Sequence, residues 1–280
     1  MILLDGPMGS EIHRLGGDTS LPLWSAKALV EQPHLIKQIH LEYLEAGADV
    51  ITTNTFRTQD TTLRKAGYFN SKEIVELAVM LAKEAKFEVN PKAKVAGSIA
   101  PIEDCYLPDL VPSDEILKQE HNITTKNLID ANVDLFLIET MNSMREAKFA
   151  YTAASEYDIP IWLGFTCDSF GQILGKDSWD DVINYFQDKV DVLMVNCTSL
   201  QGSKKVVEIF SNKNVNNWGV YPNFGKQDPI KGWTAAVIPE TFNEVLNYWI
   251  ELKPKVLGTC CGATPEETKL IRKIIDTKMN

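Results

Sequence analysis

Short apolar runs recur along the chain and alternate with segments whose apolar residues have helical spacing. Several of these runs are almost continuously apolar, as in Val-Asp-Leu-Phe-Leu-Ile-Glu from residue 133, which is typical of strands buried on both faces of a parallel sheet. Eight runs are predicted to be strands: residues 2–4, 48–55, 94–100, 134–140, 160–166, 191–197, 218–223 and 256–260.

The segments between these runs have the spacing of amphipathic helices. Ser71 and Thr264 each precede acidic residues, as helix caps do, and Pro265 would occupy the first helical position. Gly47 and Gly67 fall where helices should stop. The predicted helices cover residues 33–46, 71–87, 113–131, 143–157, 179–188, 203–210, 239–252 and 264–278.

Alternation of eight strands with eight helices predicts an α/β protein that forms a single (β/α)8 TIM barrel. Neither a Pro/Gly/Ser-rich linker nor a repeat divides the chain, so residues 1–280 are expected to form one domain. The rival architecture is a doubly wound open sheet. The segment after the first strand, Gly6-Pro7-Met8-Gly9-Ser10, is not the dinucleotide fingerprint of that rival.

Composition and charge limit the classes of molecule that the protein is expected to bind. A net charge of −10 and a pI near 5.0 argue against nucleic acid and anionic membranes, because both require a basic face. The N-terminal residues lack the features of a signal peptide, and no run of about 18 apolar residues could span a bilayer. We therefore expect a cytoplasmic protein that acts on small molecules, with its oligomeric state left open.

In a TIM barrel the active site gathers at the C-terminal ends of the strands. Polar residues at the predicted strand ends are Asp5, Thr53, Asn54, Thr55, Ser98, Glu139, Thr166, Cys167, Asp168, Asn196, Cys197, Tyr221, Asn223, Cys260 and Cys261. Four of the five cysteines therefore lie at one rim.

Three of these cysteines suggest a zinc site. Thiolates of Cys197, Cys260 and Cys261 could converge on one ion, leaving the fourth tetrahedral position open, as in catalytic zinc sites. The adjacent pair could share a metal only if the backbone leaves the strand between them. Five cysteines are a poor disulfide framework, yet the adjacent pair could instead form a vicinal disulfide or have no joint role. Cys105 and Cys167 are interpreted as small buried hydrophobes.

Other candidates have structural alternatives. Asp5 and Glu139 could cap helices or form ion pairs, or could together bind an ammonium group. Trp24 could pack against a helix or form one wall of a cation pocket. The four histidines lie in or beside predicted helices and are interpreted as surface or packing residues: His13, His34, His40 and His121.

Several longer motifs resemble those of the homocysteine S-methyltransferase family, which includes betaine-dependent and S-methylmethionine-dependent enzymes and the homocysteine module of cobalamin-dependent methionine synthase. The matching segments are residues 4–11, 23–26, 46–56, 97–101, 138–141, 195–199, 221–223 and 258–267, among which Asn-Cys combined with Cys-Cys-Gly is the most specific. The resemblance implies zinc at Cys197, Cys260 and Cys261, and binding of the homocysteine amino group by Asp5 and Glu139. Asn54 is a further candidate for substrate binding.

The resemblance implies a zinc-dependent methyltransferase that moves a methyl group from a sulfonium or quaternary ammonium donor to the thiol of L-homocysteine, giving methionine. A zinc-bound thiol is deprotonated, so no separate general base is expected. Trp24 is a candidate wall for the donor. Arg57 departs from the family pattern and could pair with Asp60 or grip an anionic group of the donor.

Three alternatives remain. The enzyme could methylate another thiol or a selenol, it could take the methyl group from a folate or from a corrinoid on a separate protein, or the chain could be a non-catalytic zinc- or thiol-binding protein.

Overall fold

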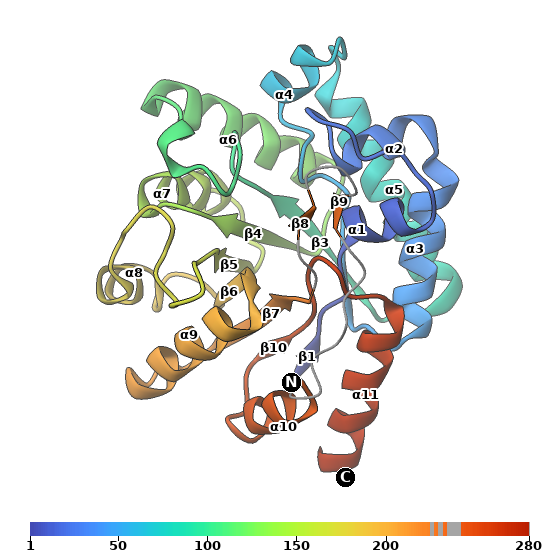
Figure 1. Cartoon of the computed structure of the whole chain (residues 1–280). Coiled ribbons are helices and arrows are strands. Elements are labelled where there is room, and N and C mark those ends of the chain that lie inside the picture. Colours follow the sequence, from blue (N-terminus) through green and yellow to red (C-terminus); the bar gives the residue numbers. More distant parts are fainter. Residues whose placement is uncertain (225–226, 229–231, 234–241, 280) are drawn as a thin grey trace.

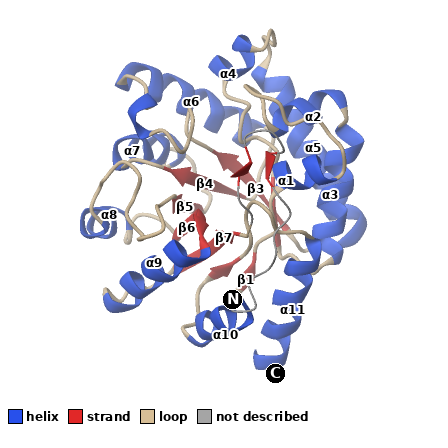
Figure 2. Ribbon diagram, viewed as in Figure 1, coloured by secondary structure: helices blue, strands red, loops and turns tan. Residues whose placement is uncertain are grey.

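Eight parallel strands form the centre of the molecule in the computed structural model, which describes residues 1–224, 227–228, 232–233 and 242–279. Helices surround these strands on the outside (Figures 1 and 2). The strand order is β1-β10-β7-β6-β5-β4-β3-β2. The bounds are β1 Ile2–Leu3, β2 Val50–Thr52, β3 Lys94–Ile99, β4 Leu135–Met141, β5 Ile161–Phe165, β6 Val192–Ser199, β7 Trp218–Asn223 and β10 Val256–Leu257.

Contacts between β1 and β2 bring the two ends of this sheet together. Leu4 and Val50 form a parallel bridge, and the backbone N–H of Asp5 donates to the Val50 oxygen at 3.0 Å. The eight predicted strands are therefore present, and the predicted TIM barrel is confirmed.

A repeated contact fixes strand register at the N-terminal end of the barrel. An aspartate lies just before each of the strands β2, β4 and β6. Its carboxylate accepts the backbone N–H of a residue in the preceding strand, at 2.7–2.8 Å. Its own N–H donates to the oxygen of that same residue at 2.8 Å. Both bonds are ordinary in length, so each pair closes a two-bond ring between neighbouring strands. The pairs are Leu3 with Asp49, Val95 with Asp134, and Ile161 with Asp191.

Eight longer helices follow the strands: α3 Pro33–Glu45, α5 Ser71–Val89, α6 Asp114–Asp130, α7 Met144–Ala154, α8 Trp179–Phe186, α9 Leu200–Asn212, α10 Phe242–Glu251 and α11 Pro265–Met279. They agree with the predicted helices within a few residues, although the predicted start at residues 239–241 lies outside the described residues. In the described part of the chain, none of the helices combines the length and apolarity needed to cross a membrane.

Three shorter helices and a hairpin were not predicted. They are α1 Met8–Arg14, α2 Ser25–Glu31, α4 Asp60–Lys65, and the strands β8 Gln227–Asp228 and β9 Gly232–Trp233. A 3-10 turn, η1 Pro108–Leu110, lies between β3 and α6. The two glycines predicted to end helices do so in left-handed conformations, Gly47 with φ +98° and Gly67 with φ +85°.

The barrel interior is apolar up to the rim. Its buried cluster includes Leu4, Val50, Leu137 and Met194, and it extends to Cys197 and Cys260. The sulfur atoms therefore sit at the top of a close-packed core, where apolar neighbours exclude water from one side.

Candidate active site

All eight residues proposed from the sequence as site residues line one cavity at the C-terminal ends of the strands. They are Asp5, Trp24, Asn54, Arg57, Glu139, Cys197, Cys260 and Cys261. The first four come from the region of β1 and β2, and the others from the ends of β4, β6 and β10. The chain thus brings together residues separated by more than two hundred positions.

The cysteine doublet lies beyond the end of its strand. β10 ends at Leu257, and Gly262 adopts a left-handed φ of +88° just after the doublet. Backbone bonds hold this turn to β7: the Cys260 N–H donates to the Pro222 oxygen at 2.8 Å, and Phe224 donates to the Cys261 oxygen at 2.9 Å. The backbone therefore leaves the strand, as sharing of one metal by neighbouring cysteines requires.

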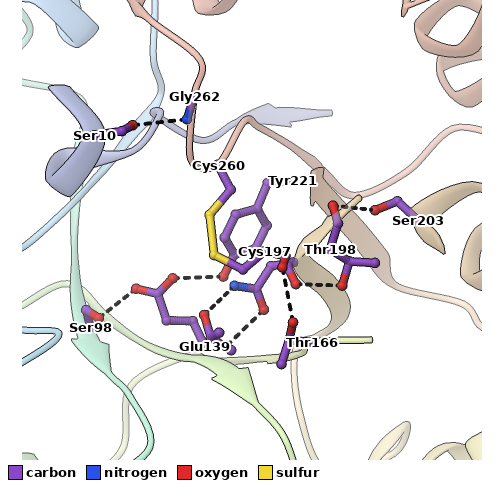
Figure 3. Close-up of a disulfide and its surroundings, with 12 residues drawn as sticks. Ser10, Ser98, Glu139, Thr166, Cys197, Thr198, Ser203, Tyr221, Cys260 and Gly262 are labelled. Carbon is purple, nitrogen blue, oxygen red and sulfur yellow. Dashed lines mark hydrogen bonds between the residues drawn. A yellow bond between two sulfur atoms is a disulfide. The ribbon is translucent and has the colours of Figure 1, made fainter. Parts of the chain in front are cut away.

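The three sulfur atoms of Cys197, Cys260 and Cys261 lie within 4.8 Å of one another. Cys197 and Cys260 are joined as a disulfide, with Cα atoms 5.6 Å apart (Figure 3). The same three cysteines that were proposed from the sequence as metal ligands therefore form one cluster. The alternative of a vicinal disulfide between Cys260 and Cys261 is wrong, because the bond links the ends of β6 and β10 and leaves Cys261 free.

The donor set fits a tetrahedral zinc ion once this disulfide is reduced. With zinc–sulfur bonds of about 2.3 Å, sulfur ligands of one ion lie about 3.8 Å apart, within the spread seen here. Burial raises the pKa of Cys261 to about 12, so the free thiol stays protonated at neutral pH. A metal would have to displace that proton on binding.

A side-chain link connects the end of β6 to the end of β4. Asn196 accepts the Thr140 N–H at 2.9 Å and donates to the Thr140 hydroxyl at 2.7 Å. Gly164 of β5 leaves room for this amide, since a Cβ there would lie 2.6 Å from its oxygen. Thr140 and Cys197 both have positive φ, 59° and 46°, which is unusual for residues with a side chain. Asn196 thus holds Cys197 and Glu139 in fixed relation.

Asp5 is buried at the end of β1, where both carboxylate oxygens contact Thr52. One oxygen accepts the Thr52 N–H at 2.7 Å and the other accepts the Thr52 hydroxyl at 2.9 Å. Burial raises the pKa of Asp5 to about 7 despite these bonds, and the nearby Glu139 raises it further. Asp5 does not cap a helix in this structure, because its carboxylate bonds to Thr52 of β2 and lines the cavity.

Glu139 occupies the equivalent place on β4. Its carboxylate accepts the Ser98 hydroxyl at 2.6 Å and the Tyr221 hydroxyl at 3.3 Å (Figure 3). Burial raises the pKa of Glu139 to about 7, while these two bonds lower it. None of the described residues that hydrogen-bond to these two carboxylates carries a positive charge. A ligand ammonium group would therefore supply the opposite charge that buried carboxylates need.

Asn54 is almost fully buried, and its Nδ2 donates to the Ser25 oxygen at 2.9 Å. Among the described residues its Oδ1 has no hydrogen-bond partner. Trp24 is half-buried and immediately precedes α2, where its φ is 49°. Its indole lies against Gly9, where an added Cβ would come 2.7 Å from Cε2. Gly9 therefore gives the ring its place on the cavity wall.

Arg57 reaches toward the loop that follows β3. Its Nη1 donates to the Glu103 backbone oxygen at 2.8 Å, and its guanidinium lies 5.6 Å from the Phe56 ring centre. Asp60 instead pairs with Arg64 at 2.5 Å. The simple surface pair of Arg57 with Asp60 is therefore not formed.

Sequence reasoning missed the contribution of the loop between β3 and α6. Asp104, Cys105 and Tyr106 of this loop line the cavity, and Cys105 is buried there with its pKa raised to about 12. Only the unusual length of the loop in the sequence could have indicated such a role. Cys167 does pack in the apolar core, and the buried His121 is a packing residue as expected.

The fold and the site define the class of protein: an enzyme built on a TIM barrel, with three cysteine sulfur atoms and two buried carboxylates around one cavity at the top of the strands. A family model described as homocysteine S-methyltransferase matches residues 2–275. The chain therefore belongs to the homocysteine S-methyltransferase family, whose members transfer methyl groups to homocysteine.

Similar proteins extend over nearly the whole chain. Homocysteine S-methyltransferase YbgG of Bacillus subtilis is 30% identical in an alignment of 295 positions, gaps included. The alignment covers 97% of this chain and 93% of YbgG. The selenocysteine methyltransferase of Astragalus bisulcatus is 27% identical, and the alignment covers 98% of this chain and 92% of that protein.

Solved structures of one homocysteine methyltransferase have the same fold over nearly the whole chain. The metallated form of homocysteine methyltransferase MmuM from Escherichia coli matches with a TM-score of 0.85 at 26% identity, covering 98% of this chain and 96% of that chain. The oxidized form of MmuM matches with a TM-score of 0.83 over the same shares of both chains.

Proposed function

We propose that this chain, acting as one domain over residues 1–280, is a zinc-dependent methyltransferase that converts homocysteine to methionine with a cationic methyl donor. The observation that carries the proposal is the convergence of three sulfur atoms, within 4.8 Å of one another, on a cavity that two buried carboxylates also line. The MmuM structures support it, since one is described as metallated and another as oxidized.

Cys197, Cys260 and Cys261 would hold the zinc, in a reducing compartment such as the cytoplasm that keeps their thiols free. When bound, zinc would keep the homocysteine thiol ionised at neutral pH. Asp5 and Glu139 would accept hydrogen bonds from the homocysteine ammonium group. Their burial makes this contact strong, because a paired charge in a low-dielectric site is screened little.

Asn54 would extend this subsite, because its free Oδ1 can accept one more N–H. The donor would lie against Trp24 and Arg57, which line the same cavity. An aromatic face attracts a sulfonium or ammonium centre by about 1–2 kcal/mol. Arg57, whose guanidinium carries several donors, would bind an anionic group of the same molecule.

A selenol acceptor is a second candidate, favoured by the likeness to the selenocysteine methyltransferase of Astragalus bisulcatus. The cavity contacts argued above address an amino group and a metal-bound thiol, and selenocysteine offers an amino group and a selenol on a side chain one methylene shorter. Selenocysteine therefore belongs in the same assay as homocysteine.

The test begins with protein purified under reducing conditions and loaded with zinc. Homocysteine is offered with S-methylmethionine, S-adenosylmethionine, betaine, dimethylsulfoniopropionate or methylfolate, and methionine is measured. We expect one zinc per chain and turnover with at least one sulfonium or ammonium donor. Cys261→Ser should lose both the zinc and the activity. Bound zinc without turnover on any donor would instead identify a metal- or thiol-binding protein.

A further inference from the structure

The loop at residues 100–113 forms the outer wall of the cavity between β3 and α6. It carries Asp104, Cys105 and Tyr106 to the cavity lining. Tyr106 is held within the loop by its N–H bond to Asp104 Oδ1 at 2.8 Å, and its hydroxyl lies 3.5 Å from the Cys197 oxygen. The shape of the wall therefore depends on what fixes this loop.

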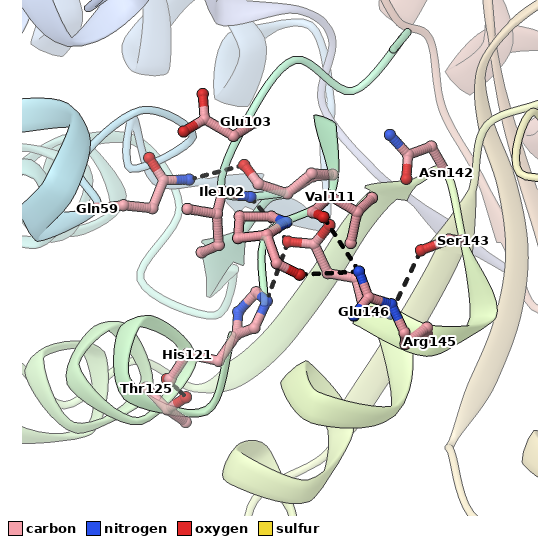
Figure 4. A network of polar contacts seen from close by, with 12 residues as sticks. Gln59, Ile102, Glu103, Val111, His121, Thr125, Asn142, Ser143, Arg145 and Glu146 are labelled. Carbon is pink, nitrogen blue, oxygen red and sulfur yellow. Dashed lines mark hydrogen bonds and ion pairs between the residues drawn. The ribbon is translucent and has the colours of Figure 1, made fainter. Parts of the chain in front are cut away.

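Glu146 holds the start of the loop from the first turn of α7. Its carboxylate is fully buried, and Oε1 accepts the Ile102 N–H at 2.8 Å (Figure 4). The same oxygen lies 3.3 Å from Nε2 of the buried His121. Glu146 is not among the residues that line the cavity. It acts on the cavity wall only through the loop.

Ser143 and Glu146 at the start of α7 differ from Thr264 and Glu267 at the start of α11 in the contact that the glutamate forms. Ser143 and Glu146 have the spacing of a capping box, in which the glutamate accepts the N–H of the cap residue. Thr264 and Glu267 form that contact at 2.6 Å. Ser143 does cap the helix, accepting the Glu146 N–H at 3.3 Å, but the Glu146 carboxylate turns inward to the loop. A buried carboxylate is costly unless it is hydrogen-bonded, so the loop contact is a specific use of this side chain.

Two arginines hold the rest of the loop. Arg145, next to Glu146, donates to the Val111 and Pro112 oxygens at 3.0 and 2.8 Å. From the β2 side, Arg57 donates to the Glu103 oxygen at 2.8 Å. Arg57 also lines the cavity, so its guanidinium and the loop share one position.

The two halves of the site differ in what positions them. Asp5 and Glu139 are held by Thr52, Ser98 and Tyr221 at the ends of strands. Arg57 and Tyr106, which we take as the donor half, are instead held by hydrogen bonds of the loop: Arg57 to the Glu103 oxygen and the Tyr106 N–H to Asp104. A change in the loop should therefore affect Arg57 and Tyr106 more than Asp5 and Glu139.

We propose that Glu146 is a positioning residue for the methyl-donor half of the site. It acts through residues 100–113, which set Tyr106 and Arg57 for the donor, and it contacts no substrate. This inference rests on the proposed methyl transfer. Loss of the Glu146 contact should raise the donor KM while homocysteine KM and zinc content stay unchanged.

The experiment compares Glu146→Ala with Glu146→Gln, which keeps an oxygen for the Ile102 N–H, and with Ser143→Ala. Ser143→Ala is the matched control, because it weakens the start of the same helix without touching the loop. For the donor with the highest turnover, we expect Glu146→Ala to raise the donor KM about tenfold, the effect of losing one buried charged hydrogen bond. Amide hydrogen exchange at residues 100–113 should rise in parallel.

Glu146→Gln should restore most of the donor affinity, and Ser143→Ala should leave both KM values within about twofold of the wild type. If Glu146→Ala does not fold, Arg145→Ala is used in its place. Because Arg145 is exposed, its substitution should raise the donor KM only about two- to threefold. If the wild type is active, an equal rise in both KM values of Glu146→Ala, or an unchanged donor KM, overturns the proposal. An inactive wild type refutes the proposed function itself.

Discussion

Glu139→Gln separates the cost of burying a carboxylate from its use in binding. The glutamine keeps one oxygen acceptor and one donor for Ser98 and Tyr221, so the local contacts can persist. The pKa of Glu139 is raised from 4.5 to about 7 by burial, so the folded protein holds the proton more tightly than the unfolded chain does. Stability from this group is therefore complete below about pH 4.5 and falls as the pH rises to about 7.

The size of the effect follows from the two pKa values. At pH 5 the wild type loses about 1 kcal/mol relative to its fully protonated state, and at pH 8.5 it loses about 3 kcal/mol. The glutamine variant has no such loss, so its advantage in free energy of unfolding should grow by about 2 kcal/mol between these pH values. Denaturant unfolding without substrate, at both pH values, measures this difference. Glu244→Gln, on the exposed face of α10, is the control.

The same variant should bind homocysteine more weakly. Loss of one charge-assisted hydrogen bond to the ammonium group costs about 1.5–3 kcal/mol, which lowers affinity about ten- to hundredfold. A stability advantage that does not change with pH would refute the burial argument. An unchanged homocysteine KM would refute the assignment of Glu139 to the amino group.

Three further changes test other contacts. Asn196→Ala should lower the free energy of unfolding by about 2–4 kcal/mol, since it leaves two buried groups of Thr140 unpaired, and zinc content should fall with it; unchanged metal content would contradict the link. Gly9→Ala should displace the Trp24 indole, shifting tryptophan emission and raising the donor KM, and an unshifted spectrum would count against the contact. Asp134→Ala should reduce stability in chemical denaturation by about 1–3 kcal/mol without altering either KM.

The barrel and the strand-end residues could be predicted from the sequence because both follow from period and order alone. Once eight buried strands alternate with helices, every C-terminal strand end must lie on one rim. That rule places Asp5, Glu139 and the cysteines together without knowledge of any contact. The same rule cannot say whether Cys197 and Cys260 bind a metal or pair with each other, because the outcome depends on redox state and metal supply.

The loop half of the site could not be predicted in this way. The short helices α1, α2 and α4 span too few turns for a clear apolar period, and their positions come from tertiary contacts. Arg57 illustrates the difficulty. Its near neighbour Asp60 suggested a local ion pair, whereas the structure pairs it with the Glu103 backbone, far along the chain.

Two helix starts in this chain share the spacing of a hydroxyl residue followed three positions later by a glutamate, yet the two glutamates form different contacts. Thr264 and Glu267 form a capping box at a helix start where the carboxylate can reach the cap residue. In α7 the same spacing places Glu146 beside the buried Ile102, whose backbone N–H needs an acceptor inside the protein. A cap N–H near solvent can bond to water, but a buried loop N–H cannot. The carboxylate therefore goes to the loop, and a local motif takes on a role that only the assembled barrel defines.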